Sequence, residues 1–280
     1  MGVFINMMWP CSHSPFSVAA AASDEAYLIQ LQKAAQAKRL WEHRHWQVLL
    51  HYQPRLWSGS AESQVDDAAF FLSPSGKYDP QAELDATLAS FFAPPDQEEG
   101  AEHPQCKFIA RYQWLKQELG FDAESLPEYA CPQFDDWMAE MGPDAVTLVF
   151  PAAYLNNPAS MFGHTLLRID SNKRSTQTRL LDFTVNYAAD TEEERGLSYA
   201  MKGLFGAYEG SFSVAPYYVQ VKRYGDIENR DIWEYHLTLS HEEVLRMLMH
   251  TWELRSAGLD YYFLDENCSY QLLSLLEAAR

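Results

Sequence analysis

The sequence predicts an α+β fold, in which a helical amino-terminal region precedes an antiparallel sheet that carries further helices. Apolar residues recur at the helical period through residues 24–52. After Pro143 the pattern changes to short runs rich in β-forming residues. Two of these runs, 163–170 and 180–187, flank the polar segment 171–176. That arrangement indicates two neighbouring antiparallel strands, so we expect the sheet in the second half of the chain.

The composition excludes several classes of protein. The chain has 280 residues, with 21 Lys and Arg against 39 Asp and Glu, and a formal net charge of −18. Hydrophobic residues make up 47% of it, which is enough for a sizeable core and excludes a disordered chain. Nucleic-acid binding is not expected, because it needs clustered Lys and Arg. No run reaches the roughly 20 apolar residues of a membrane-spanning helix.

The helical region is predicted to consist of separate helices with turns between them. The helix over 24–52 should end at Pro54, because proline cannot continue a helix. Turn-forming residues surround a short apolar patch at 68–72, and 94–100 has the composition of an exposed linker. Further helices are predicted at 81–92, 108–119 and 133–141.

The second half combines strands with two longer helices. Besides the two strands above, β-rich runs predict strands at 146–150, 217–224 and 232–239. Ser240, with Glu243 three residues later, forms a capping-box pattern that opens a helix. A last helix begins near Cys268, in an apolar run.

The amino-terminal end has features of an export signal. Its small-residue run 19–22 resembles a signal-peptidase site. Against this, no Lys or Arg precedes Lys33 and Pro10 interrupts the apolar stretch, so a disordered terminus or a misassigned start is the alternative. Cys11 lacks the residues that precede a lipidated cysteine. We expect four segments: a signal peptide or disordered terminus at 1–22, a helical region at 23–100, a helical connector at 101–145 and an α+β domain at 146–280.

Cys106 and Cys131 each lie beside a proline, in the helical connector. In an exported protein they would form a disulfide, which typically adds about 2–4 kcal/mol of stability. The alternative is a pair of buried thiols. No CxxC pair appears, and no metal site is expected.

Cys268 has the sequence environment of a thiol nucleophile. It lies in the first turn of the predicted last helix, where unpaired N–H groups and the helix dipole favour the thiolate. A lone cysteine there is more often structural, so the interpretation depends on a nearby base. His164 is the candidate base, with Asn186 to orient its imidazole and Asp182 as the alternative orienting residue. Weaker candidates for the base are His236, His241 and His250.

The predicted pairing of the two strands places His164 directly opposite Asn186. In this register one face of the hairpin is polar and the other is mainly apolar, so the register is self-consistent. A structural histidine at the end of a strand is the alternative for His164. The polar face would carry His164, Arg168, Asp170, Asp182, Thr184 and Asn186.

Longer motifs around these residues resemble a known family. The motifs are 156–165, 185–189, 202–210 and 267–273. They are similar to the Lnb-type amino-terminal periplasmic domain, whose namesakes are bacterial lipoprotein N-acyltransferases. The resemblance covers roughly residues 100 to 280. More broadly, His164 preceding Cys268 resembles the circularly permuted papain-like fold of NlpC-type amidases and lecithin:retinol acyltransferase-like enzymes.

The resemblance implies a permuted papain-like catalytic domain over 146–280 that acts as a thiol acyltransferase without a cofactor. Cys268, assisted by His164 and Asn186, would take an acyl chain from a phospholipid as a thioester. The amino-terminal cysteine of a lipoprotein would then accept it. The location would be the periplasm or cell envelope, with the membrane reached through segments outside this sequence.

Supporting roles are expected for two further groups of residues. The Cys268 N–H, with a side chain from the first group, would stabilise the oxyanion or position the substrate. The second group would form a lid or a membrane-dipping loop that binds lipid, with an ordinary packed turn as the alternative. The first group is Asn156, Asn157, Ser160 and Asn267, and the second is Lys202, Leu204, Phe205, Tyr208 and Phe212.

Two other functions remain open on the sequence alone. A cell-wall thiol peptidase or amidase would use the same Cys-His dyad, but in an open polar cleft rather than beside an apolar groove. A non-enzymatic periplasmic domain that binds lipid or protein would leave Cys268 and His164 far apart. The chain has no HExxH, P-loop or GxSxG motif for metal hydrolysis, nucleotide binding or serine hydrolysis.

Overall fold

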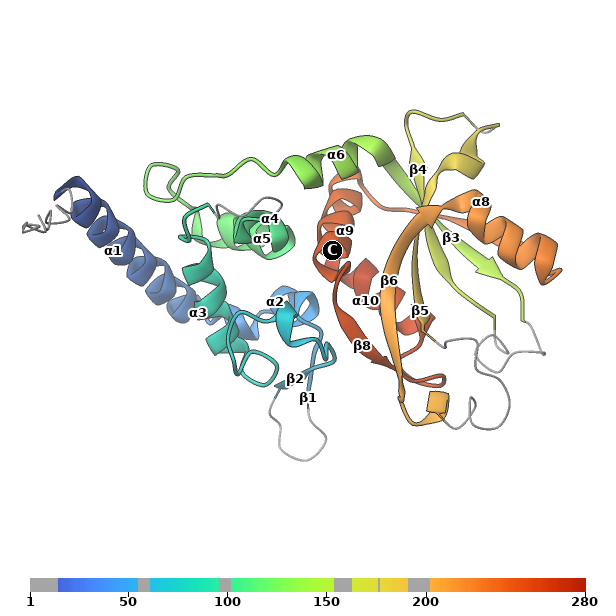
Figure 1. Cartoon of the computed structure of the whole chain (residues 1–280), viewed down its shortest axis with the longest axis horizontal. Helices are drawn as coiled ribbons and strands as arrows, with labels where there is room; N and C mark the ends of the chain where they lie inside the picture. Colours follow the sequence, from blue (N-terminus) through green and yellow to red (C-terminus); the bar gives the residue numbers. More distant parts are fainter. Residues whose placement is uncertain (1–14, 55–60, 96–101, 154–162, 176, 191–201) are drawn as a thin grey trace, which may run out of the picture.

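The computed structural model describes residues 15–54, 61–95, 102–153, 163–175, 177–190 and 202–280. A helical amino-terminal region and a six-stranded antiparallel sheet lie on opposite sides of α9 and α10, as Figure 1 shows. The α+β prediction is therefore confirmed at this level. Residues 1–14 of the expected leader lie outside the described residues, and residues 15–22 belong to the first helix.

The predicted single helix over 24–52 is wrong, because the chain turns within it. Helix α1 (Pro15–Lys38) ends at Arg39, which adopts a left-handed conformation with a φ of 50°. A short 3₁₀ turn, η1 (Leu40–Glu42), leads into α2 (Arg44–Leu49). The remaining elements before the connector are β1 (Tyr52–Pro54), β2 (Ala61–Ser63), η2 (Ala68–Phe70) and α3 (Pro80–Ser90).

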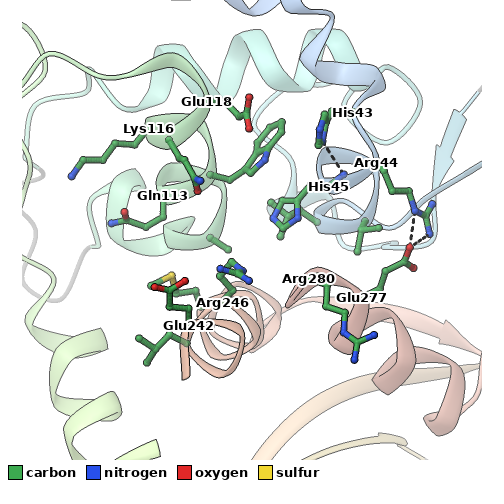
Figure 2. A pocket seen from close by; sticks show the side chains of 18 residues that line it. His43, Arg44, His45, Gln113, Lys116, Glu118, Glu242, Arg246, Glu277 and Arg280 are labelled. Atoms are coloured by element: carbon green, nitrogen blue, oxygen red, sulfur yellow. Dashed lines mark hydrogen bonds and ion pairs between the residues drawn. The ribbon is translucent and has the colours of Figure 1, made fainter. Parts of the chain in front are cut away.

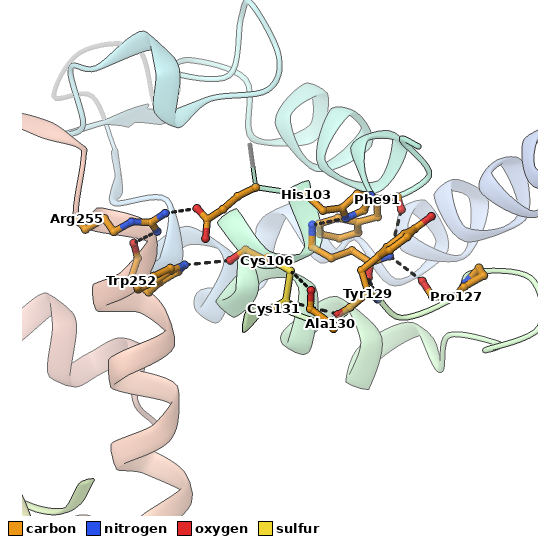
Figure 3. Close-up of a disulfide and its surroundings, with 11 residues drawn as sticks. Phe91, His103, Cys106, Pro127, Tyr129, Ala130, Cys131, Trp252 and Arg255 are labelled. Carbon is orange, nitrogen blue, oxygen red and sulfur yellow. Dashed lines mark hydrogen bonds and ion pairs between the residues drawn. A yellow bond between two sulfur atoms is a disulfide. The ribbon is translucent and has the colours of Figure 1, made fainter. Parts of the chain in front are cut away.

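The connector contains three short helices held by the predicted disulfide. Cys106 and Cys131 are bonded, with an S–S distance of 2.02 Å (Figure 3). The Trp252 indole N–H donates to the Cys106 carbonyl at 3.1 Å, so the disulfide also adjoins a later helix. The three helices are α4 (Pro104–Lys107), α5 (Ile109–Leu119) and α6 (Pro132–Met141).

The main sheet has the order β7-β3-β4-β5-β6-β8, and all neighbours are antiparallel. Helices α9 (His241–Leu254) and α10 (Cys268–Ala278) pack against one face, and α9 opens with the predicted Ser240–Glu243 capping box. The strands are β3 (Pro143–Pro151), β4 (Leu166–Ser171), β5 (Phe183–Ala189), β6 (Tyr208–Pro216), β7 (Ile232–Leu237) and β8 (Gly258–Tyr261).

The segment 217–224, predicted as a strand, is helical. It forms α8 (Tyr217–Val221) and runs into the π-helical segment η5 (Lys222–Ile227). Tyr217 and Tyr224 are seven residues apart, about two helical turns, and both pack against Val149 and Leu166. The aromatic and β-branched composition favours a strand, but packing on the second face of the sheet favours the helix.

The register of β4 and β5 differs from the predicted one by two residues. Leu166, not His164, pairs with Asn186, because the connection includes the 3₁₀ turn η4 (Arg179–Leu181) where a strand was expected. A shift of two residues leaves every side chain on its predicted face. His164 therefore still lies on the face of Asn186, just before β4 begins.

A buried ionic network joins the amino-terminal region to α9. The Arg111 guanidinium forms ion pairs with Glu83 at 3.0 Å and Glu253 at 3.3 Å, and all three side chains are fully buried. Beside them, Nε2 of His51 lies 3.2 Å from Nε2 of His250. Burial raises the pKa of Glu253 to about 7, although the charge of Arg111 opposes this rise. The single arginine therefore balances the charge of one carboxylate, and the second carboxyl group, that of Glu253, tends to keep its proton.

The raised pKa of Glu253 predicts a pH-dependent effect of Glu253→Gln. Because the pKa of Glu253 is raised in the folded protein, its protonated carboxyl stabilises the fold. This stability is fully present below the ordinary pKa of a glutamate, near 4.3, and is lost as the pH rises through 7. The free energy of unfolding of the native protein, relative to Glu253→Gln, should therefore fall by about 1–3 kcal/mol between pH 4.5 and 8. Urea unfolding at several pH values measures this, and a pH-independent difference would contradict it.

No helix within the described ranges combines the length and apolar character needed to cross a bilayer. Nor do those residues contain a cluster of His, Cys, Asp and Glu able to hold a metal ion.

Candidate active site at the start of helix α10

Cys268 is the first residue of α10, at the end of the sheet where β4 begins. The Asn267 side chain caps this helix, accepting from the N–H groups of Ser269 at 3.1 Å and Tyr270 at 3.3 Å. The Cys268 thiol is buried and stands outside the disulfide. The capped helix start thus holds a single thiol where the helix dipole favours its thiolate.

His164 and Asn186 form the second part of the site. Nε2 of His164 lies 2.6 Å from Oδ1 of Asn186, and both side chains are buried. Because an amide oxygen can only accept, Nε2 carries the proton, and Nδ1 is the nitrogen left for the thiol. Gly163, before the histidine, has a φ of 100°, and a Cβ there would lie 2.5 Å from the Phe150 ring. Only glycine can adopt this backbone conformation so close to the Phe150 ring, and the conformation positions His164, the next residue, beside Asn186.

The environment of Cys268 favours an ionised thiol. Burial works to raise the pKa of Cys268, but it is outweighed by a hydrogen bond and charge from His164. The N–H of Thr165 and the hydroxyl of Tyr261 also hydrogen-bond the sulfur, and together these groups lower the pKa of Cys268 to about 7. Near neutral pH a large fraction of this cysteine is therefore thiolate, the reactive form.

Tyr261 is a residue of the site that the sequence did not indicate. Its hydroxyl accepts from the Cys268 N–H at 3.3 Å and contacts the sulfur, and its ring stacks on Tyr187 at 5.5 Å. Tyr261 ends β8, a strand of four residues that pairs with β6. Such a short strand has too little alternation to be recognised, and nothing local connects its last residue with Cys268.

The perturbed thiol gives a direct prediction. Alkylation of Cys268 by iodoacetamide should accelerate with a midpoint near pH 7, because only the thiolate reacts. In His164→Ala the midpoint should move upward, since the histidine is the strongest of the groups that lower this pKa. Peptide-resolved mass spectrometry separates this thiol from Cys11. An unchanged midpoint in the variant would show that His164 does not act on the thiol.

The other predicted site residues are distributed differently. Asp182, the alternative orienting residue, pairs with Arg174 at 3.3 Å instead of with the imidazole. Asn267 caps α10, and its amide nitrogen donates to the Phe263 carbonyl at 3.3 Å. Asn156, Asn157 and Ser160 lie outside the described residues.

The five residues predicted to bind lipid do not form one exposed loop. Leu204 and Phe205 are exposed, by 44% and 67%. Tyr208 and Phe212 are buried on β6 and belong to the core. The Lys202 ammonium lies 5.8 Å from the centre of the Tyr208 ring. Of these five residues, only Lys202, Leu204 and Phe205, in the segment before β6, are exposed in this conformation.

The alternative histidines lie away from the thiol. His250 belongs to the buried pair with His51, His236 lies 3.8 Å from Asp170, and His241 begins α9. Of the histidines predicted as candidate bases, His164 is the one that the structure places against Cys268.

Two family models match the chain. The model described as the Lnb N-terminal periplasmic domain matches residues 133–280, a range that contains His164, Asn186 and Cys268. A domain of unknown function, DUF7843, matches residues 38–118. No curated protein and no solved structure gives a match.

Proposed function

The chain belongs to the Lnb N-terminal periplasmic domain family, and from that premise we propose that it is a cysteine-dependent acyltransferase of the cell envelope. The observation that carries the proposal is the Cys268–His164–Asn186 arrangement, a thiol with a lowered pKa beside an oriented imidazole. The contact between thiol and imidazole argues against a purely binding domain, for which these residues would have no reason to meet.

The order of these groups fits a circularly permuted papain-like domain over 146–280. His164, just before β4, and Asn186, on the neighbouring strand β5, precede the cysteine in the chain, and Cys268 begins the helix packed on those strands. The connector at 101–145 and the helical region at 23–100 would support this domain through the disulfide and the Arg111 network.

The proposed reaction has two half-reactions. The Cys268 thiolate attacks an ester carbonyl of a phospholipid, and the C–O bond breaks as protonated His164 gives its proton to the leaving alcohol, releasing a lysophospholipid. The acyl chain stays on sulfur as a thioester. Neutral His164 then takes a proton from the α-amine of a lipoprotein's amino-terminal cysteine. The amine attacks the thioester, forming an amide and restoring the thiol.

We propose Tyr261 as an oxyanion donor in both half-reactions. Its hydroxyl contacts the sulfur and accepts from the Cys268 N–H, so it lies beside the atom to which a bound acyl group would be attached. When the sulfur becomes neutral in the thioester, the phenol proton is free to turn to the carbonyl oxygen of that acyl group. Loss of one such donor typically costs about 10²–10³-fold in rate, which Tyr261→Phe would test.

An apolar surface beside the site supports a lipid substrate over a cell-wall peptide. Trp233 and Tyr235 on β7 are 56% and 53% exposed and pair with Phe150 and Leu148 on β3. Val149 pairs with Leu166 in the antiparallel register of β3 and β4, so the next residue on β3, Phe150, lies opposite Thr165. The N–H of Thr165 contacts the Cys268 sulfur, so the row of side chains leads to the candidate site. Exposed Trp and Tyr side chains are typical of membrane interfaces. We propose that the enzyme meets the membrane at this surface.

This placement predicts that Trp233→Asp reduces acylation of Cys268 from phospholipid vesicles by about tenfold or more, since a charge on that surface opposes lipid contact. Alkylation of Cys268 by soluble iodoacetamide should be unchanged. Ile227→Asp is the matched control, because Ile227 is 71% exposed in η5, on the other face of the sheet. Equal losses in both variants would remove the special role of the β7 surface.

Intact-mass analysis after incubation with phosphatidylglycerol vesicles tests the function. The expected result is an acyl-sized adduct that hydroxylamine releases and that Cys268→Ser lacks. A peptide bearing an amino-terminal diacylglyceryl-cysteine should then discharge it with formation of an amide. Cleavage of cell-wall peptides by the same thiol, without an acyl adduct, would establish the peptidase instead and overturn the proposal.

A further inference from the structure

A cavity of about 910 Å³ lies between the two regions that the family models match. Its walls are α2 and α5 from the first region, and α9 and α10 from the second (Figure 2). The cavity is separate from the candidate active site. Cys268 begins α10 whereas Glu277 and Ala278, which line the cavity, end it, and this separates the two by roughly 15 Å along the helix.

The floor of the cavity is apolar. Trp114, one of the lining residues, is 8% exposed and stacks with Trp46 at 5.8 Å and with His45 at 5.6 Å. A cavity of this size with an apolar lining is within the usual range for small-molecule sites, which often form where two structural units meet. The apolar lining residues are Val48, Leu49, Ala110, Trp114, Leu245 and Met249.

One cation in the cavity, Arg246, makes no direct ion pair among the described residues, although its charge acts on the Glu243 carboxyl one turn earlier. Arg246 donates through Nε to the Ala279 carbonyl at 2.8 Å, but no carboxylate lies within ion-pair distance of it among the described residues. In Figure 2 its guanidinium points toward His45. The other basic groups of the lining are engaged: Arg44 pairs with Glu277, Lys116 with Glu128 and Arg280 with Glu243.

The charges around Arg246 limit how much negative charge a ligand can carry. Glu242 and Glu118 also line the cavity, so they oppose a ligand of high negative charge. In Figure 2 Glu118 lies across the cavity from Arg246, whereas Glu242 lies beside Arg246, one turn earlier on α9, and His45 faces Arg246 from α2. A ligand with one anionic group and an apolar remainder would fit this pattern, whereas a polyanion would not.

We propose that this cavity binds an amphipathic anion, with its carboxylate or phosphate on Arg246 and its hydrocarbon part against Trp114 and Met249. A free fatty acid and a single-chain phospholipid share this chemistry. The site requires no acyl transfer at Cys268, so it stands independently of the proposed function. Because both matched regions form its walls, a bound ligand would stabilise their association.

Binding of laurate below its micellar concentration tests the proposal, measured by calorimetry and by quenching of tryptophan fluorescence with a brominated fatty acid. We expect saturable binding to one site, with Trp114→Phe removing most of the quenching. Arg246→Gln should weaken binding by about tenfold or more, because it removes a charge-assisted hydrogen bond. Arg223→Gln, an exposed arginine of η5, is the matched control and should bind as the native protein does.

A second variant and a second ligand complete the test. Met249→Trp fills the cavity and should abolish binding even if Arg246→Gln alters the end of α10, and circular dichroism reports whether each variant is folded. Lysophosphatidylglycerol and laurate compared side by side identify the preferred head group. Binding only to intact vesicles, or equal affinity in native protein, Arg246→Gln and Met249→Trp, would overturn the proposal.

Discussion

Cells that carry only Cys268→Ser are expected to lose lipoprotein N-acylation, and purified His164→Ala is expected to lose about 10²–10⁴-fold in acyl transfer. Serine in place of Cys268 has a hydroxyl that is not ionised near pH 7, whereas the pKa of the native thiol is about 7. Without the imidazole, the thiol returns toward its protonated form and the leaving alcohol receives no proton. Transfer of a radiolabelled acyl chain to a diacylglyceryl-cysteine peptide measures both losses.

The two substitutions should not be additive, because the thiol and the imidazole act as one unit. A double variant should therefore be no slower than Cys268→Ser alone. Ser269→Ala is the matched control. It removes the 2.7 Å hydrogen bond between Ser269 and Thr165 in the same helical turn but leaves the nucleophile in place, so it should keep most of the activity. Normal N-acylation in cells with only Cys268→Ser would exclude the thioester mechanism.

The alternation of polar and apolar residues was sufficient to place His164 and Asn186 on one face of the sheet. It was not sufficient to assign their register, because a period of two is satisfied equally by any even shift. The 3₁₀ turn η4 takes up residues expected in a strand and moves the pairing by two positions. The hydrogen bond between His164 and Asn186 still forms in the shifted register, because the histidine lies just before β4 begins and on the same face of the sheet.

Features determined by distant packing could not be predicted. Tyr217 and Tyr224 lie in a segment of strand-like composition and become helical because both reach Val149 and Leu166 from one side. Tyr261 reaches Cys268 only because the short strand β8 pairs with β6. In each case the local sequence favours another structure or none, and contacts with remote residues decide the outcome.

Arg111→Met is expected to lower the free energy of unfolding by about 3–5 kcal/mol, because it leaves two carboxylates in the interior without their cation. Glu83, Arg111 and Glu253 come from α3, α5 and α9, and their side chains are fully buried. The guanidinium also donates to the Phe70 carbonyl at 3.0 Å and lies 4.3 Å from the centre of the Phe70 ring. No local pattern connects these residues, although together they join the helical region to α9.

Arg44→Met is the matched control for this loss. The Arg44–Glu277 pair joins the same two regions, but its side chains are 62% and 45% exposed, so its removal should cost less than about 1 kcal/mol. Adding Glu253→Gln to Arg111→Met should recover part of the lost stability, since one buried carboxylate is then neutralised. Urea unfolding at pH 8, where the Glu253 carboxyl is mostly ionised, measures all four proteins. Equal, small losses in Arg111→Met and Arg44→Met would show that the buried network does not hold the two regions together.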